Sequence, residues 1–312
     1  FLPRAVEANH EAIRQVAEAL LDELVPRGRA ELHDDFAAPL PITAFCAVLG
    51  LDEANHDDLK RWAEELTLGM TFPDRAEKGW DELRTFTRSE VERRRRAVAD
   101  AELDPDQDPV GTVVPEGLFS HLACHPLDGE LLDADEVTGM VSMMLVAGHE
   151  TTASFLSNCV WRLLEDRTRW ERLRREPDLV PNALEESLRF DPPVLGICRT
   201  NTREVAMHDV TIPEDSKVLY LMGAANRDAA LFDRPDEFVL DRPLIDTRRH
   251  VAFGWGPHFC LGAHLARLTA RVGLQALLAR VPTLRLDGPT ERLEAPFLWG
   301  RRHVPVAWGP RG

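Results

Sequence analysis

Apolar residues recur every three or four positions along most of the chain, which predicts a largely helical protein. This spacing predicts helices over 5–24, 42–49, 57–69, 78–102, 167–175, 182–190 and 261–278. A short extended piece is expected within 31–40. The helix over 78–102 carries four consecutive arginines at 93–96, and on a helix these point in different directions. We therefore expect a solvated helix face there rather than an anion site.

The longest predicted helix covers 137–164 and contains no proline. Asp133, followed three residues later by Glu136, matches a capping box at its start. Residues 140–147 are apolar on every side, which is typical of a buried central helix. Gly148 and the threonines that follow it weaken the helical hydrogen bonds, so a local opening or π-bulge is expected there.

Beyond residue 190 the apolar period becomes shorter, and strands are predicted over 194–199, 204–212 and 217–221. A segment rich in proline and aspartate follows at 226–243 and is expected to be irregular. Many helices followed by a late group of strands indicate an α+β fold that is predominantly α-helical.

Composition narrows the possible partners and compartments. The 312 residues carry a net charge of −16, which argues against nucleic acid and anionic membrane as partners. No apolar stretch is long enough to span a bilayer. The five cysteines are widely scattered and include no C-x-x-C pair, so neither a disulfide framework nor a zinc ribbon is expected. These features together favour a cytoplasmic protein.

One cysteine stands in a distinctive loop at 253–262. Its alternating glycines and a proline shape a tight turn in which the backbone can approach a flat partner. Cys260 lies where a helix is predicted to begin, and free N–H groups there lower a thiol's pKa and bind its thiolate. A thiolate in an apolar loop suits an axial ligand of haem iron. The alternative is a buried structural cysteine, which the surrounding glycines and His258 disfavour.

The motif Phe-Gly-x-Gly-x-His-x-Cys-x-Gly over 253–262 resembles the cysteine loop of cytochromes P450 of the soluble bacterial type. The resemblance extends over essentially the whole chain. It implies a cytochrome P450 fold with a long central helix, small late β-sheets and a cysteine haem-ligand loop. It also implies one domain over 1–312, with the N-terminal portion of the fold absent from the sequence.

The resemblance implies haem b (iron protoporphyrin IX) as cofactor, with Cys260 as the metal ligand. The implied activity inserts one oxygen atom from O2 into an organic substrate. Further cofactor-binding residues would be Ala147, Gly148, Arg199, Phe253, Gly254, His258 and Gly262. Arg199 and His258 resemble residues that contact a haem propionate.

By the same resemblance, 147–152 forms an oxygen-binding groove in the central helix. Thr151 would hold dioxygen and a water, and Glu150 would relay protons. A zinc-binding His-Glu-x-x-His helix is a competing interpretation, but Ala153 stands where its second histidine would have to be. A separate charge network of Glu186, Arg189 and Arg242 would support the fold rather than the chemistry.

The substrate is expected to be a hydrophobic small molecule, because the positions that would line its pocket are apolar. These positions are Met144, Ala147, Val194, Leu195, Ile197 and Leu298. Each could instead fill the core, and for Met144 this alternative is nearly as well supported.

A basic patch near the cysteine loop suggests docking of a ferredoxin-type or fused reductase electron donor. Its members are Arg248, Arg249, Arg267 and Arg271. Ordinary surface charge is an equally good explanation of the patch. Two other functions stay open: a peroxide-driven oxygenase, and a non-catalytic haem-binding protein or inactive truncated remnant.

Overall fold

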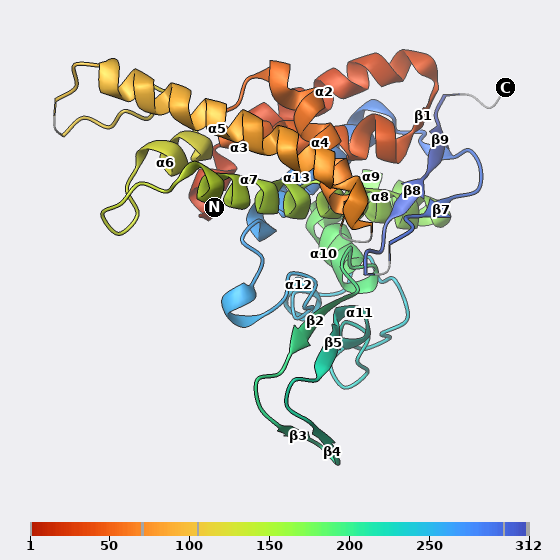
Figure 1. Cartoon of the computed structure of the whole chain (residues 1–312). Helices are drawn as coiled ribbons and strands as arrows, with labels where there is room; N and C mark the ends of the chain where they lie inside the picture. Colours follow the sequence, from red (N-terminus) through yellow and green to blue (C-terminus); the bar gives the residue numbers. More distant parts are fainter. Residues whose placement is uncertain (1, 70–71, 105, 296, 310–312) are drawn as a thin grey trace.

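The computed structural model describes residues 2–69, 72–104, 106–295 and 297–309 (Figure 1). Its α-helices are α1 (Pro3–Glu7), α2 (His10–Leu24), α3 (Pro39–Leu49), α4 (His56–Gly69), α5 (Glu77–Asp100), α6 (Leu118–Cys124), α7 (Ala134–Gly148), α8 (Glu150–Glu165), α9 (Arg167–Arg175), α10 (Val180–Phe190), α11 (Met222–Ala225), α12 (Leu244–Thr247) and α13 (Ala263–Arg280). Short turns of 3-10 or π-helix are η1 (Val25–Arg27), η2 (His33–Ala37), η3 (Glu53–Asn55), η4 (Pro73–Arg75), η5 (Pro177–Leu179) and η6 (Gly256–His258).

The strands are short and form small antiparallel sheets. They are β1 (Arg29–Glu31), β2 (Gly196–Thr200), β3 (Val205–Met207), β4 (Val210–Ile212), β5 (Lys217–Leu221), β6 (Arg285–Leu286), β7 (Glu291–Arg292), β8 (Arg301–His303) and β9 (Pro305–Ala307). The order β1-β9-β6 joins the two ends of the chain, with Ala30 opposite Val306. The hairpin β3–β4 projects away from the helices (Figure 1). The expected α+β class with helix in large excess is confirmed.

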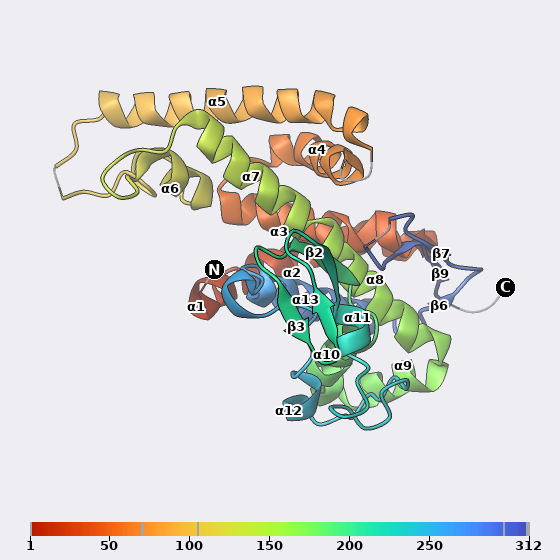
Figure 2. The same ribbon diagram turned by 60° about the horizontal axis from the view of Figure 1, so that its bottom comes forward.

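The helices enclose two clusters of buried apolar side chains. One cluster lies among α2, η2, α8, α10 and α13, and the other among α3, α4, α5, α6 and α7. Helices α7 and α8 follow one another diagonally through the molecule and connect the two clusters (Figure 2). Helix α8 is buried on nearly every side, because apolar or small residues occupy most of its positions.

The expected central helix over 137–164 is divided in two at His149, where the backbone adopts φ −83° and ψ −77°. A continuous helix was therefore the wrong expectation, whereas the opening expected near Gly148 is confirmed. The capping box is also confirmed: the Asp133 side chain accepts the N–H groups of Asp135 and Glu136, and the Glu136 carboxylate accepts that of Asp133.

Two local expectations are only partly met. Only Glu31 of the segment 31–40 is extended, and η2 and α3 follow directly. Of the arginines at 93–96, Arg93 and Arg96 are exposed as expected, but Arg94 is 1% exposed and stacks on the Phe119 ring at 4.6 Å. Its Nε also donates to Ser120 Oγ over 3.0 Å. Charge patterning alone does not reveal that Arg94 on α5 has buried partners on α6.

None of the helices in the described part of the chain combines the length and the apolar character needed to cross a bilayer.

Candidate functional site

The fold of the cysteine loop depends on its first two glycines and on one backbone hydrogen bond. Gly254 and Gly256 adopt φ values of 73° and 70°, a region that favours residues without a Cβ. The Cys260 N–H donates to the carbonyl of Phe253 over 2.8 Å and closes the loop. This closure places Cys260 three residues before α13, which begins at Ala263, two residues later than the sequence pattern predicts.

The electrostatic surroundings of Cys260 differ from the expectation. The residue is exposed on one side, yet the loop removes enough water from the sulfur to raise the pKa of the thiol. The Gly262 N–H bonds the sulfur and Arg267 lies nearby, and both effects lower the pKa without overcoming desolvation. The prediction that the helix start alone lowers this pKa is therefore wrong. A bound metal ion has to supply the rest of the driving force for ionisation.

A buried carboxylate that sequence reasoning missed supports this loop. Glu185 Oε2 accepts from His250 Nε2 over 3.0 Å, and Arg267 donates to both carboxylate oxygens over 2.7 and 3.0 Å. Burial acts to raise the pKa of Glu185, but these two partners outweigh it and lower the pKa to about 2. The Arg267 guanidinium also lies 4.4 Å from the Phe253 ring. The sequence signal for Glu185 is only its position next to Glu186, a member of the expected charge network.

Glu186, Arg189 and Arg242 lie in direct contact inside the protein. Arg189 donates to both oxygens of Glu186 over 2.8 Å, and Arg242 Nε donates to Oε2 over 3.0 Å. All three residues are buried. Arg189 also donates to carbonyls of the irregular segment 226–243, at Asn226, Pro235 and Glu237. The cluster therefore attaches this segment to α10.

At the opening between α7 and α8, the Thr151 hydroxyl lies beside a stretch of helix that no other side chain of the described residues covers. Thr151 Oγ1 donates to the carbonyl of Ala147 over 2.6 Å. Ala147 is exposed, and a Cβ added at Gly148 would meet no atom within 4 Å. The helix therefore leaves room for a flat group at the position where the resemblance implies the oxygen-binding groove.

Glu150 points into the protein rather than into solvent. It is 6% exposed, and its Oε1 accepts from Ser154 Oγ over 2.8 Å. Burial raises the pKa of Glu150 to about 7, because the ionised form is poorly solvated there. A carboxyl group with this pKa can carry and release a proton near neutral pH.

His33 is a second residue that sequence reasoning missed. It lies in η2, is fully buried, and its Nε2 stands 3.8 Å from Glu150 Oε2. Its Nδ1 is bonded to Ser157 Oγ over 3.2 Å. Burial lowers the pKa of His33 to about 4, so the imidazole is neutral beside a carboxyl that keeps its proton. No sequence pattern links position 33 to position 150.

The two residues expected to contact a haem propionate are both exposed. Arg199 lies on β2, and its Nη1 donates to the neighbouring carbonyl of Cys198 over 2.9 Å. His258 ends η6 in the cysteine loop. Both side chains are accessible to an anionic group.

The expected pocket positions are only partly brought together. Val194 and Leu298 face each other in an isolated β-bridge, and Leu195 N–H donates to the Phe297 carbonyl over 2.9 Å. Ile197 is 39% exposed on β2. Met144 instead packs against the second apolar cluster, which agrees with the alternative that it fills the core.

The residues present fit haem. The donor is a single sulfur that receives a backbone N–H, and a soft ligand of this kind suits haem iron. Large apolar side chains of the loop remain exposed, namely Trp255, Phe259 and Leu261, and Met143 is exposed on α7. Apolar side chains left uncovered beside a metal-binding donor are what a planar, mostly apolar cofactor would contact.

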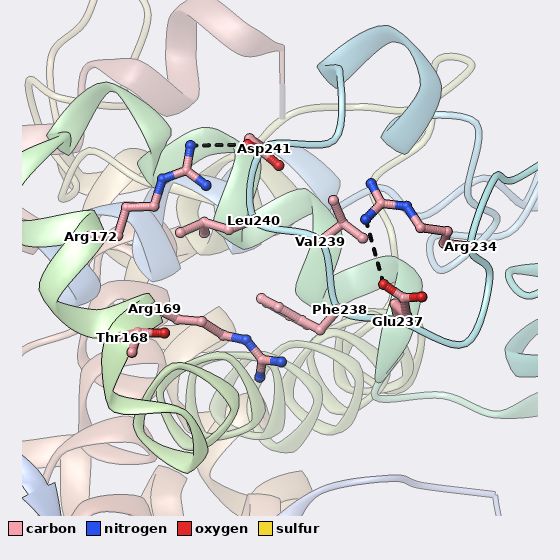
Figure 3. Close-up of a pocket in the computed structure, with 9 residues that line it drawn as sticks. All are labelled: Thr168, Arg169, Arg172, Arg234, Glu237, Phe238, Val239, Leu240 and Asp241. Carbon is pink, nitrogen blue, oxygen red and sulfur yellow. Dashed lines mark hydrogen bonds and ion pairs between the residues drawn. The ribbon is translucent and has the colours of Figure 1, made fainter.

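A separate surface pocket lies between α9 and the irregular segment (Figure 3). Its charges are largely paired, since Arg172 lies 3.0 Å from Asp241 and Arg234 lies 3.5 Å from Glu237. None of the predicted site residues lines it. We therefore assign no ligand to it.

Comparisons with known proteins find a matching family and similar chains. A family model described as Cytochrome P450 matches residues 71–281. Cytochrome P450 107B1 of Saccharopolyspora erythraea is 36% identical over 99% of the chain and 72% of its own length. The 6-deoxyerythronolide B hydroxylase of the same organism is 35% identical, over 98% and 72%. The structure of CYP109E1 from Bacillus megaterium in complex with testosterone has a TM-score of 0.86 at 29% identity, over 99% of this chain and 81% of that one.

Replacing Glu186 by alanine is expected to destabilise the protein by about 3–5 kcal/mol, because two buried guanidinium groups lose their counter-charge. Urea unfolding followed by circular dichroism measures this change. Glu165→Ala is the control, since Glu165 forms an exposed pair with Arg162 and its loss costs less than about 1 kcal/mol. Equal losses in the two variants would contradict a buried ionic cluster.

Glu150 makes stability depend on pH in a definite direction. The unfolded chain releases this proton near pH 4.5, whereas the folded protein keeps it until about pH 7. The wild type therefore loses stability as the pH rises through this interval. Glu150→Gln lacks this loss, so its stability relative to wild type should rise by about 3 kcal/mol between the two values.

Urea unfolding of both proteins at several pH values measures this difference. The pKa values of His33 and His149 are each lowered to about 4, which makes stability rise with pH. This effect is present in both proteins, so it largely cancels in the difference between them. A difference that stays constant with pH would show that Glu150 ionises normally.

Proposed function

The chain belongs to the cytochrome P450 family, and from this premise we propose specific roles for its residues in a haem-dependent monooxygenase. The enzyme is an oxidoreductase that acts on small substrates with haem as cofactor. We propose that Cys260 Sγ is the iron ligand. The observation that carries this assignment is the closed loop that brings the sulfur to the Gly262 N–H beside exposed apolar side chains.

When bound, haem supplies the reductive activation of dioxygen, and the chain supplies orientation, protons and a dry surface. Phe253, Gly254 and Gly262 would pack near the cofactor on the sulfur side, and Ala147 and Gly148 on the opposite side. Arg199 and His258 would bind its propionates, because both are exposed cationic or hydrogen-bonding groups.

Thr151 and Glu150 would divide the proton chemistry between them. The Thr151 hydroxyl lies in the helix opening and can turn from the Ala147 carbonyl toward a bound oxygen ligand. Glu150 holds a proton near neutral pH and can release it in the direction of this opening. We therefore assign proton delivery to Glu150 and the positioning of oxygen and water to Thr151.

The substrate is proposed to be a hydrophobic small molecule. Val194, Leu195 and Leu298 gather at the bridge before β2, and Ile197 and Ala147 leave apolar surface exposed. The similar proteins include one named for the hydroxylation of 6-deoxyerythronolide B and one solved with testosterone. Both names agree with an apolar substrate for this chain.

An acidic electron donor of the ferredoxin or reductase type is proposed to dock near Arg248 and Arg249. Arg248 is 57% exposed and lies 3.8 Å from Glu185, at the edge of the cluster that supports the cysteine loop. Arg267 and Arg271, the other two expected members, are less exposed, at 28% and 36%, and hold closer ion pairs, 2.7 Å from Glu185 and 2.9 Å from Glu7. The docking charge is therefore assigned mainly to the first pair.

Replacing Cys260 by serine should abolish the red-shifted absorption band that the reduced, carbon monoxide-bound protein shows when a thiolate ligates haem. Cys198→Ser is the matched control, because Cys198 is also an exposed free thiol but lies on β2. The control should keep the band. If Cys260→Ser retained the same band, the sulfur at this position would not be the ligand.

Turnover with a ferredoxin system, compared with turnover driven by peroxide, then separates a monooxygenase from a peroxide-driven oxygenase. A protein that shows the band but no turnover in either system would be a non-catalytic haem protein.

Reversing both charges in Arg248→Glu/Arg249→Glu should slow reduction by an acidic donor about tenfold at low salt, because docking is electrostatically steered. Stopped-flow absorbance measures the reduction rate. The difference from wild type should shrink as salt rises. An unchanged rate at low salt would rule out docking at these two residues.

A further inference from the structure

Asp34, His33 and Glu150 are neighbouring groups that lead from the protein surface into the core. Asp34 is half exposed, and its Oδ1 lies 4.0 Å from His33 Nε2. The same nitrogen lies 3.8 Å from Glu150 Oε2. His33 and Glu150 are both buried, so His33 Nε2 lies within 4.0 Å of an acid that reaches water and of an acid that does not.

His33 is held in one orientation. Its Nδ1 is bonded to Ser157 Oγ over 3.2 Å, on the next turns of the helix that carries Glu150. Among the residues that the structure describes, Nε2 has no hydrogen-bond partner. If Nδ1 keeps its hydrogen for Ser157, the free lone pair of Nε2 can accept a proton from either neighbouring acid.

Charged groups on α4, on β8 and in η2 itself act on His33 and Glu150. Arg302 on β8 and Lys60 on α4 disfavour a charged His33, whereas Asp34 favours it. Glu64 on α4 and Asp34 disfavour an ionised Glu150, and Arg302 favours it. Buried His149 beside the helix opening is also influenced by His33. Burial is the largest influence on both groups, and together with these charges it lowers the pKa of His33 to about 4 and raises that of Glu150 to about 7. Between these two pH values neither group stores a buried charge.

We propose that Asp34 and His33 form a proton inlet that reloads Glu150 from solvent. In each cycle Glu150 gives up its proton, and solvent delivers a proton to the exposed Asp34 carboxyl. His33 Nε2 takes that proton from Asp34, and the same nitrogen passes it to the Glu150 carboxylate. One proton moves inward and His33 returns to its neutral form. Both gaps exceed a hydrogen bond, so a small side-chain rotation or a bridging water has to close each of them. The inlet rests on the proton-delivery role proposed for Glu150.

Exchange of the Glu150 proton with solvent measures the inlet without turnover. The haem-loaded protein is diluted into D2O, and infrared spectroscopy follows the isotope shift of the protonated carboxyl band. Glu150→Gln assigns that band by removing it. His33→Phe should slow the shift about 10- to 100-fold, because the ring keeps its volume but has no proton-accepting nitrogen. Asp34→Asn should slow it severalfold.

His33→Gln is the second variant, since it keeps a polar group for Ser157 but lacks a basic nitrogen, and it should slow exchange as His33→Phe does. His303→Phe is the matched control, because this half-exposed histidine on β8 pairs with Glu31 and should leave exchange unchanged. Unchanged exchange in either His33 variant would overturn the inlet, as would a wild-type Glu150 already ionised at neutral pH.

The two proposals fail separately in these experiments. The carbon monoxide spectrum reports thiolate ligation, and the carboxyl band reports the inlet. A normal spectrum with unchanged exchange removes the inlet and leaves the haem assignment intact. Slowed exchange in a protein that shows no thiolate band would support the proton path while removing the proposed use of it.

Discussion

The carboxylate of Glu186 holds together the part of the molecule on which the cysteine loop depends. It binds Arg189 on its own helix and Arg242 near the end of the irregular segment, and it accepts the Val239 N–H over 2.8 Å. Few backbone hydrogen bonds of regular structure exist in 226–243, so this charge cluster replaces them. Asn226, whose carbonyl receives Arg189, also accepts the Val251 N–H just before the loop. The loop is thereby connected to the helical core.

The division of the central helix is the second constraint. A continuous apolar helix would pack well but would offer no polar group in the middle of the protein. The break at His149 gives up helical regularity there and turns Glu150 inward, toward Ser154 and His33. A buried acid is unfavourable when ionised, and the protein avoids that cost by raising its pKa. The same strategy keeps a proton available inside the core.

Local signals in the sequence were enough for most of the long helices and for the loop. The capping box at Asp133, the weakness near Gly148 and the glycine-rich motif around Cys260 each involve residues close in sequence. The missed features join distant residues. His33 and Glu150 are neighbours although more than a hundred residues separate them in the sequence, and Arg94 packs on Phe119 of another helix. Such contacts depend on how helices pack, which periodicity does not specify.

Desolvation acts on Cys260 and Glu150 in the same direction but with different consequences. In both cases it raises the pKa and favours the neutral form. This suits Glu150, which must hold a proton until it is needed, whereas an iron ligand must be ionised. The Gly262 N–H and Arg267 only partly offset the effect at the sulfur. Ionisation of Cys260 is therefore coupled to binding of the metal, and the loop is built to receive a thiolate that it does not generate alone.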